Sequence, residues 1–459
     1  MSIIRFSLVG ILLGLGMSLM AQTELDAYRF SQQTLTGTAR SLGMAGAFSA
    51  VGADLTSASL NPAGLGLYRR TDLVFSPGLR FIQNEGDFIG SMSQDTRTNF
   101  GFANLGVAIS GKVYEGYGRN RRQATSGFMS YNIAIGFNQL ENYHREINAS
   151  AFNPLSSITE QFAEQANGSV PEQFGFGSYP ALAWDAFLIN PLANSIDQYF
   201  GAVDSGMVQQ QIRMEERGRK NEWFIAAGGN IDDFLYIGLK IGIQDIRYEQ
   251  SYAYTEEDVN GVHNFFDDDP NSNLEYPFNS LLLAEDLITT GTGINGALGV
   301  IIRPTDAFRI GLSFTSPTVL GLVDEYNARM EHDFTIVDQV SGLEKDTLAV
   351  QRLNEPFQFD YNLTSPYRVT IGLMYLFKKY GFISADVDFV DYSSSRLNSA
   401  YETTDPAFYD FRLENDLIRD LFSPTINARV GAEGRVGIYR FRAGYAYQGG
   451  GLEREAVIY

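Results

Sequence analysis

The chain has 459 residues, a net charge of −20 and no cysteine. The negative charge argues against nucleic-acid binding and against docking through a basic surface, and the lack of cysteine excludes disulfides and thiolate metal sites. Aromatic residues are abundant, with 33 Phe and 25 Tyr but 2 Trp. This composition suits a β-barrel with aromatic girdles, and a large secreted β-sandwich is the alternative.

Residues 1–21 have the pattern of a secretion signal. Arg5 supplies the positive charge, residues 6–20 are apolar, and Ala21 is a small residue suited to cleavage. The apolar run is too short for a membrane-spanning helix, and no later stretch reaches about 18 apolar residues. We therefore expect an exported protein without helical spans: periplasmic, secreted, or a barrel in the outer membrane of a Gram-negative bacterium.

Residues 22–71 differ from the rest, because small residues dominate them and strand alternation is weak. Residues 37–52 are rich in Gly, Ala and Ser, and the Asn61-Pro62 pair favours a turn. Small residues allow close backbone packing in a confined space. A mobile periplasmic tail is the alternative interpretation of the same composition.

From residue 72 onward, apolar residues alternate with polar ones in segment after segment, which predicts β-strands. Clear examples are 129–138, 235–244, 367–378, 383–389, 426–435 and 438–448. The polar faces carry charges of both signs. In lipid each Arg or Lys at mid-depth would cost about 2–4 kcal/mol, whereas a wet or plugged lumen tolerates them.

Short and long connections between these segments alternate, which is typical of an outer-membrane barrel. Short turns lie at 230–234, 303–307, 378–381 and 436–438, and long external loops are predicted at 150–205, 251–290, 331–355 and 395–423. Residues 157–166 and 407–421 have helical tendency, and 111–126 is predicted to be a longer periplasmic turn. Strands are expected near 72–84, 98–110, 127–148, 208–230, 234–250, 291–303, 307–330, 355–378, 380–395, 424–436 and 438–448, with 208–217 the least regular.

Eleven is an odd number, whereas bacterial single-chain barrels have even numbers of strands and end on the periplasmic side. Residues 449–459 lack clean alternation. They either form a short twelfth strand, or the chain lacks its last strands. In the second case the first strand should have an unpaired edge.

The N-terminal segment resembles the FadL/TodX family of outer-membrane transporters for hydrophobic compounds. The resemblance lies in the small residues of 43–52, in an acidic residue, and in the Asn-Pro-Ala-Gly run before the first strand; the Ser-Pro-Thr within 313–322 is a weaker likeness. It implies an all-β fold, a 14-stranded transmembrane antiparallel barrel over 72–459, with 22–71 as a hatch inside the lumen. The hatch residues are Gly43, Gly46, Asp54, Asn61, Pro62, Ala63 and Gly64.

The resemblance also implies passive uptake of hydrophobic small molecules, with long-chain fatty acids as the default. Ligand would be captured by external loops and would leave through a wall opening beside the hatch. Candidate capture residues in predicted loops are Trp184, Phe187, Leu188, Tyr276, Phe278, Leu281 and Leu282. The expected partners are outer-membrane lipid, the hydrophobic ligand and the barrel assembly machinery, and the protein is expected to be a monomer. Alternatives are a polar-solute porin or a surface binding protein, such as a haem receptor or an adhesin.

No catalytic, cofactor or metal site is predicted, and an enzyme is not expected. The three histidines, which are predicted to be exposed loop residues far apart in sequence, are His144, His263 and His332. Asp386 and Asp388 should face the lumen. There they are expected to pair with inward Arg368, Arg429 or Arg440.

Overall fold

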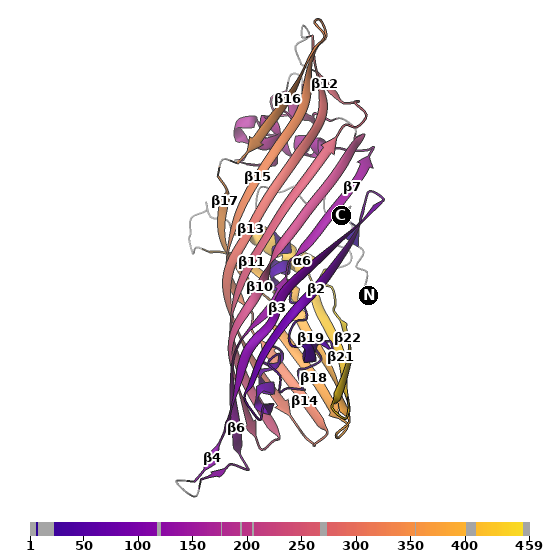
Figure 1. The fold of residues 1–459 in the computed structure, drawn as a ribbon. Helices are drawn as coiled ribbons and strands as arrows, with labels where there is room; N and C mark the ends of the chain where they lie inside the picture. Colours follow the sequence, from indigo (N-terminus) through magenta and orange to yellow (C-terminus); the bar gives the residue numbers. More distant parts are fainter. Residues whose placement is uncertain are drawn as a thin grey trace.

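The computed structural model describes residues 6–7, 23–116, 121–175, 177–192, 195–203, 206–266, 273–353, 355–400 and 410–452. Most of these residues belong to one large antiparallel sheet that curls on itself (Figure 1). The predicted signal peptide lies outside the described residues except for 6–7, and so do residues 453–459 of the last segment.

Eleven strands in the described part of the chain form the wall, which is the lower half of the molecule in Figure 1. In pairing order they are β2 (Asp72–Phe88), β3 (Ser91–Lys112), β6 (Phe128–Asn142), β10 (Val208–Ile231), β11 (Leu235–Glu257), β13 (Leu274–Ile302), β14 (Phe308–Thr315), β18 (Arg368–Leu376), β19 (Gly381–Asp391), β21 (Pro424–Val436) and β22 (Tyr439–Tyr447). The all-β class and the approximate strand positions are confirmed. Residues 208–217 belong to β10.

The short turns cluster at one end of the wall, which we call the turn end. At the opposite end, the tall end, the sheet continues upward (Figure 1). This upper part, which we call the tall sheet, contains the upper parts of β10, β11 and β13 together with β7 (Arg145–Asn153), β12 (Asn264–Phe266), β15 (Val319–Asp338), β16 (Leu343–Arg352), β17 (Phe357–Thr364) and β20 (Arg396–Ser399).

The prediction of loops at 251–290 and 331–355 was therefore wrong for most of these residues, which belong to strands. The outward residues of β11 become polar after Ile243, yet its ladder with β10 continues to Glu257. Apolar alternation ends where the outer face changes from apolar to polar surroundings. Backbone pairing needs only a neighbouring strand, so it continues past that point.

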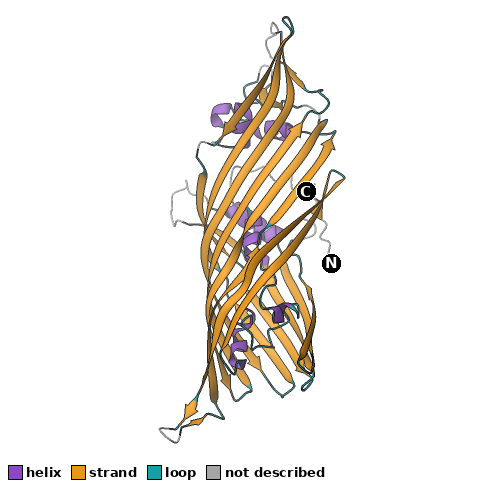
Figure 2. Ribbon diagram, in the orientation of Figure 1, coloured by secondary structure: helices purple, strands orange, loops and turns teal. Residues whose placement is uncertain are grey.

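The helices lie inside the curled sheet and near the tall end (Figures 1 and 2). Inside are α1 (Glu24–Ser31), α2 (Ala39–Leu42), α3 (Ser57–Leu60) and the 3-10 helix η2 (Pro62–Leu67). The insertion between β7 and β10 contains α4 (Ile158–Ala166), η4 (Pro171–Gln173), α5 (Tyr179–Asp185), β8 (Ile189–Pro191) and β9 (Tyr199–Gly201). The remaining elements are η5 (Tyr392–Ser394), α6 (Arg412–Leu421), the short hairpin of β4 (Tyr114–Glu115) and β5 (Arg122–Gln123), and β1 (Phe6–Ser7).

Helix α4 confirms the helical tendency of 157–166, and α6 confirms the described part of 407–421, of which 407–409 lie outside the described residues. Within the part of the chain that the structure covers, no helix has the length and apolar character needed to cross a membrane. In those residues β22 pairs with β21 alone, and β2 pairs with β3 and, over two residues, with β1.

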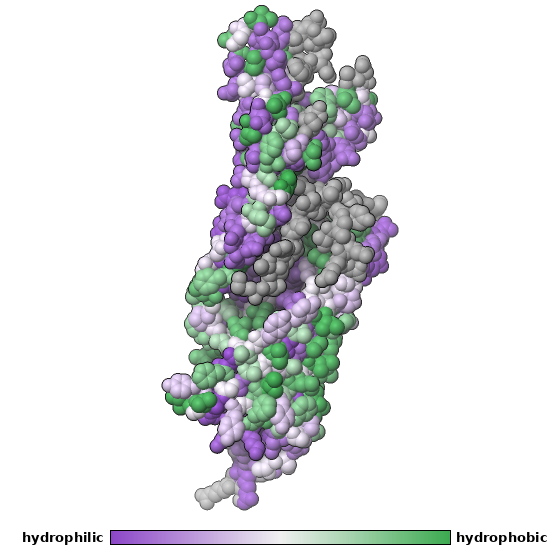
Figure 3. Space-filling model, turned by 90° about the vertical axis from the view of Figure 1, so that its right-hand side faces the viewer, coloured by the Kyte–Doolittle hydropathy of each residue, from purple (hydrophilic) through white to green (hydrophobic). Residues whose placement is uncertain are grey.

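The outer face of the wall carries a band of exposed apolar side chains. On β11 the exposed outward residues are Ile237, Leu239, Ile241 and Ile243, and Arg247 follows them on the same face. The same face of β10 changes from Ile225 and Trp223 to charged residues, and Figure 3 shows a largely hydrophobic lower half beneath a hydrophilic upper half. Such a band flanked by charge matches the lipid-facing surface of a transmembrane barrel.

The apolar band can be tested with two arginine substitutions on the outer face of β11. Ile241→Arg should lower the free energy of unfolding in lipid vesicles by about 2–4 kcal/mol, because a charge at mid-depth meets hydrocarbon. The matched control is Ser251→Arg, which lies on the same face beyond the band. Urea titration followed by the cold SDS-gel shift measures both. Equal losses would show that the band does not face lipid.

Candidate functional site

Residues 23–71, here called the hatch, are packed against the inner face of the wall. Met44 and Phe48 form a cluster with Met374 and Phe382, and all four are at most 7% exposed. A second cluster joins Leu55 and Leu65 to Ala108, Ala134 and Phe224 of the wall. The hatch therefore shares two apolar cores with the barrel.

Glycines on neighbouring wall strands lie directly under the hatch backbone. A Cβ atom at Gly238 would lie 2.2 Å from the carbonyl carbon of Pro62, and one at Gly299 would lie 2.0 Å from Asn61 Oδ1. Side chains are not accommodated at such distances, so glycine permits this close approach. We use "glycine seat" for the set Gly228, Gly238, Gly299, Gly311, Gly372, Gly431 and Gly444, each of which has a hatch atom within 3 Å of its ideal Cβ position.

Asn61 links the hatch to the wall by hydrogen bonds. Its side chain is fully buried, and its Oδ1 accepts a hydrogen bond from the Ala63 amide at 3.1 Å, which caps η2. Its Nδ2 donates to the carbonyl oxygen of Ser49 at 2.9 Å and to that of Val300 in β13 at 3.3 Å. One side chain thus links two parts of the hatch and one wall strand.

Asp386 of β19 is a second anchor, which the sequence analysis missed. Its Oδ2 accepts from the backbone amides of Phe48 and Ser49 at 2.8 and 2.9 Å. The expected ion pairing holds for Asp388 instead, which lies 2.5 Å from Arg429 and 3.6 Å from Arg368. Asp386 faces inward as predicted, but its carboxylate meets hatch amides where an ion pair was expected, because strand alternation gives the face of a residue and not its partner.

Lys220 of β10 holds the start of the hatch. Its side chain is 1% exposed, and its Nζ donates to the carbonyl oxygens of Phe30 and Gln32 at 2.7 and 2.6 Å. A buried ammonium group needs such acceptors. The anchors on β10, β13 and β19 together fix the hatch by side-chain hydrogen bonds, not by a sheet ladder.

The other predicted hatch residues lie within the same packed segment. Asp54 accepts from Thr38 Oγ1 at 2.9 Å and from the Thr56 amide at 3.0 Å, so it bonds within the hatch. Gly64 donates its amide to the carbonyl of Asn61 at 2.9 Å. Gly43 ends α2, and Gly46 has a φ of +72°, which favours glycine.

The wall forks beside the hatch. β3 and β6 pair from Lys112 opposite Ser130 up to Asn104 opposite Asn138. Above that point the described part of β3 pairs with β2 alone, while β6 continues against β10. We use "wall fork" for residues 95–103 of β3 and residues 139–148 of β6 and β7, two stretches that do not pair with each other.

Side chains close the wall fork in place of a backbone ladder. Asn142 Nδ2 donates to Asn99 Oδ1 at 2.7 Å, Arg97 forms an ion pair with Glu146 at 2.6 Å, and Asp95 accepts from the Asn148 amide at 2.8 Å. Each such contact contributes little compared with a continuous ladder. The fork can therefore open without loss of strand pairing elsewhere.

The hatch touches both the base and one edge of the wall fork. Asn138 Nδ2 donates to Ser59 Oγ at the base. Higher up, the carbonyl of Leu140 accepts from the Thr34 amide at 3.0 Å. Leu140 is skipped in the pairing of β6 with β10, so its carbonyl is available to the hatch. Movement of the hatch would change the edge of the fork.

Most of the predicted capture residues are packed at the tall end. Leu188, Phe278 and Leu281 are at most 2% exposed and share one core with α4 and α5. The prediction that residues 276–283 form a loop was wrong, since Tyr276, Phe278, Leu281 and Leu282 lie in β13. Phe187 remains exposed, and Trp184 is partly buried against the core.

An apolar pocket of about 420 Å³ opens in the insertion at this end. Of the predicted capture residues it involves Trp184, whose ring lies edge-to-face to Tyr199 with centroids 5.7 Å apart. Its other lining residues are Val170, Pro171, Glu172, Pro191, Ser195 and Ile196. We call this cavity the outer pocket.

The prediction of exposed histidines was wrong for His263 and His332, which are buried. His332 lies between the rings of Phe278 and Phe334 in the tall sheet, and its Nδ1 is 3.0 Å from the carbonyl of Ala186. Burial lowers the pKa of His332 to about 4, so the ring is neutral at pH 7. His144 is partly exposed.

The glycine seat can be tested on one strand. Gly299→Ala should displace Asn61 and loosen the hatch, while β13 keeps its ladder and the barrel still folds. The matched control is Gly296→Ala, where an added Cβ would meet only the Lys240 carbonyl oxygen at 3.6 Å. Trypsin cleavage at Arg29 and Arg40 in folded protein should become at least about tenfold faster in the first variant alone, corresponding to about 1.4 kcal/mol. Equal cleavage rates would contradict the seat.

The Asp386 anchor can be tested by removing its carboxylate. Asp386→Ala leaves the buried amides of Phe48 and Ser49 without an acceptor, at a cost of about 1–3 kcal/mol for each group. We expect faster hydrogen exchange at residues 44–51 and an intact barrel. Asp386→Asn retains one acceptor oxygen and should give an intermediate rate. If both variants exchange like the unmodified protein, Asp386 does not anchor the hatch.

No protein-family model and no curated protein match the chain. The fold is similar to that of TodX, the toluene transporter of Pseudomonas putida, at 12% identity over 94% of this chain and 87% of that chain, with a TM-score of 0.43. It is also similar to a FadL homologue of Pseudomonas aeruginosa, at 12% identity over 92% of this chain and 82% of that chain, with a TM-score of 0.41. CymD, a monoaromatic hydrocarbon channel, is similar at 13% identity over 90% of this chain and 84% of that chain, with a TM-score of 0.39. The similarity to these structures is one of fold.

Proposed function

We propose that the protein is an outer-membrane channel for passive uptake of hydrophobic small molecules, with long-chain fatty acids as the default substrate. The observation that carries this proposal is a hatch seated in the barrel directly beside a fork in the wall. The band of outward apolar residues supports insertion in lipid. The expected partners are outer-membrane lipid, the ligand and the barrel assembly machinery, and the expected state is a monomer.

The proposed route begins at the tall end. The outer pocket offers apolar surface around Trp184 and Tyr199, and apolar surface of this kind binds apolar ligands. The core beneath it is packed, so ligand entry requires that the insertion shift. The two states of the insertion would differ in packing, not in fold.

The proposed exit is the wall fork. An apolar ligand that leaves between β3 and β6 enters the bilayer without crossing water. The contacts that close the fork are side-chain hydrogen bonds and ion pairs, such as Asn99 with Asn142 and Arg97 with Glu146. The hatch bonds to Leu140 at its edge, so release of the hatch and opening of the fork would be coupled.

The alternatives fit these residues less well. A polar-solute porin needs an open aqueous path, whereas the lumen here holds a buried hatch with two apolar cores. A haem receptor or an adhesin needs a ligand site formed by loops, but neither function requires a glycine seat or a wall fork. A crosslink that holds the wall fork closed distinguishes these functions, because it should stop transport and leave surface binding intact.

The absence of native cysteine permits a clean crosslink across the fork. The pair Asn99→Cys and Asn142→Cys, whose side chains are in hydrogen-bond contact, should form a disulfide on oxidation. We expect uptake of a fluorescent dodecanoate analogue into proteoliposomes to fall at least about tenfold and to recover on reduction. Ser110→Cys with Asn132→Cys, a registered pair within the closed β3–β6 ladder, is the matched control.

Three outcomes separate the hypotheses. Loss of uptake in the fork pair alone supports exit through the fork. Equal uptake by the locked and reduced protein would reject the fork but keep a channel. No uptake of any hydrophobic probe by the unmodified protein would reject the channel itself.

A further inference from the structure

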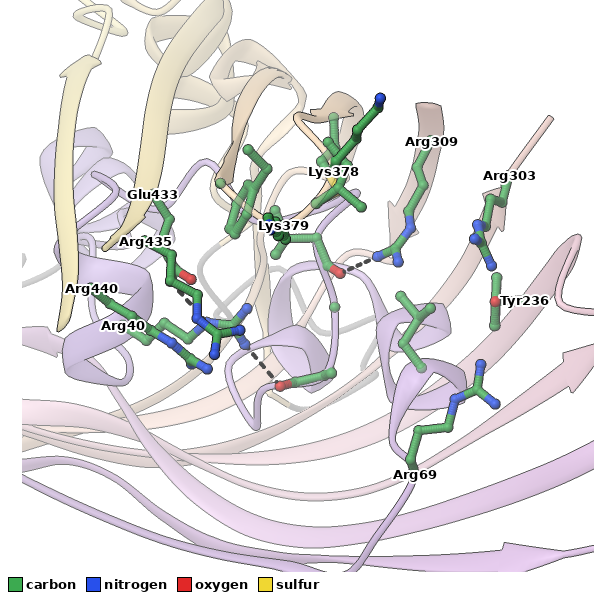
Figure 4. A pocket seen from close by; sticks show the side chains of 18 residues that line it. Arg40, Arg69, Tyr236, Arg303, Arg309, Lys378, Lys379, Glu433, Arg435 and Arg440 are labelled. Atoms are coloured by element: carbon green, nitrogen blue, oxygen red, sulfur yellow. Dashed lines mark hydrogen bonds and ion pairs between the residues drawn. The ribbon is translucent and has the colours of Figure 1, made fainter. Parts of the chain in front are cut away.

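A second cavity, of about 350 Å³, opens at the turn end of the barrel (Figure 4). It lies between the hatch and the turns that follow β13, β18 and β21. Its basic lining residues are Arg40, Arg69, Arg303, Arg309, Lys378, Lys379, Arg435 and Arg440, and among the described lining residues Glu433 is the one carboxylate. We call this cavity the basic vestibule. Its positive charge contrasts with the chain's net charge of −20.

Protein carboxylates neutralise only part of this charge. Arg69 pairs with Asp233 at 2.9 Å, and Arg303 pairs with Asp306 at 2.6 Å. Glu433 is shared between Arg442 at 2.7 Å and Arg40 at 3.6 Å. The ion pairs found in the described part of the chain do not include the five other basic residues, Arg309, Lys378, Lys379, Arg435 and Arg440.

Backbone carbonyls orient several of these cations without cancelling their charge. Arg309 Nη1 donates to the Val51 carbonyl at 2.8 Å, Arg40 Nη1 donates to the Ala53 carbonyl at 3.0 Å, and Arg435 Nε donates to the Gly437 carbonyl at 3.1 Å. The first two contacts fix the guanidinium groups against the hatch (Figure 4). The charges are therefore held in place, although they repel one another.

Donor groups remain available in the vestibule. The Nε atom of Arg303 is buried and makes no hydrogen bond in the described structure, and Arg40 Nε has the 3.6 Å contact with Glu433 in place of a hydrogen bond. Figure 4 shows Arg40, Arg435 and Arg440 together on one side of the cavity, and Arg69 and Arg303 near Tyr236 on the other. Buried donors without a partner are costly, and a bound anion would satisfy them.

The vestibule is also partly apolar. Its lining also includes Val51, Leu67, Met374, Leu376 and Phe382. A small inorganic anion would use only the cations. A molecule with an anionic head and an apolar tail would use both kinds of surface.

We propose that the basic vestibule is an anion-binding site for the head group of an amphiphile, a carboxylate or a phosphate ester, whose tail lies along the apolar lining. Arginine is suited to both groups, because its planar donor fork matches two oxygens of a carboxylate or phosphate. The head group could belong to a transported amphiphile, in which case the inference rests on the proposed channel function, or to a membrane lipid. The site spans hatch and wall, so a bound anion would relieve the repulsion between Arg40 on the hatch and the cations of the wall.

The test compares ligands that differ only in the head group. Binding of decanoate, decyl phosphate and decanol to the full chain in neutral detergent is measured by calorimetry. We expect the unmodified protein to bind the two anionic probes at least about tenfold more tightly than decanol. In the variant Lys378→Gln/Arg435→Gln/Arg440→Gln this preference should disappear, so that the three probes bind with about equal affinity while decanol binding stays unchanged.

Two further proteins control for charge and for folding. Arg213→Gln/Arg217→Gln/Arg247→Gln removes three exposed cations from the outer face of the tall sheet and should keep the full preference. Arg440→Gln alone, at an exposed position in β22, should give an intermediate preference even if the triple vestibule variant folds poorly.

A second experiment, with membrane lipids in place of the decyl probes, identifies the source of the anionic head group. Native mass spectrometry from nanodiscs of mixed phosphatidylglycerol and phosphatidylcholine shows which lipid the protein retains. Retention of phosphatidylglycerol by the unmodified protein but not by the vestibule variant, without a preference for decanoate, would support the site with lipid as its ligand.

The proposal is overturned if the unmodified protein shows no preference for anionic heads in either arm, or if the vestibule variant keeps that preference. Binding and uptake of decanol without any charge preference would leave the channel function standing and reject the vestibule alone. Failure to bind any probe, decanol included, would reject the channel function instead.

Discussion

The close approach of the hatch backbone to the glycines of the wall is the contact on which the rest of this structure depends. Gly238 and Gly299 let Pro62 and Asn61 reach positions that a Cβ atom would occupy. Because the hatch lies this deep, its Asn61 reaches the Val300 carbonyl of the wall at 3.3 Å, and Asp386 of the wall accepts from the Phe48 and Ser49 amides at 2.8 and 2.9 Å. The same depth brings Thr34 to the edge of the wall fork.

The hatch is held against the wall by packing and by a few local hydrogen bonds. Lys220 and Asn61 donate the side-chain hydrogen bonds that anchor it, and Asp386 accepts two from hatch amides. No sheet ladder crosses from hatch to wall in the described residues. A ladder would have to break cooperatively, whereas such bonds can be exchanged one at a time. The wall fork is closed in the same manner.

The two ends of the molecule differ in chemistry. The tall end has an apolar core and an apolar pocket, while the turn end has a cavity lined by eight basic residues. Passage from the first to the second would suit a ligand with an apolar body and an anionic head. In the proposed route the ligand enters at the tall end and leaves through the wall fork.

The sequence by itself determined the wall, because a strand with one face in lipid must alternate, and that period of two is visible in strands such as 235–244. Local turn chemistry also predicted the turn at Asn61-Pro62, whereas the hatch residues were implied by the family resemblance. The sequence could not locate the tall sheet, where polar faces remove the alternation, nor the buried state of His332 and Phe278. The glycine seat, the Asp386 anchor and the basic vestibule join residues up to 400 positions apart, as in the contact of Gly444 with Met44. Only tertiary packing decides such contacts, because strand alternation fixes which face a residue occupies but not what lies opposite it.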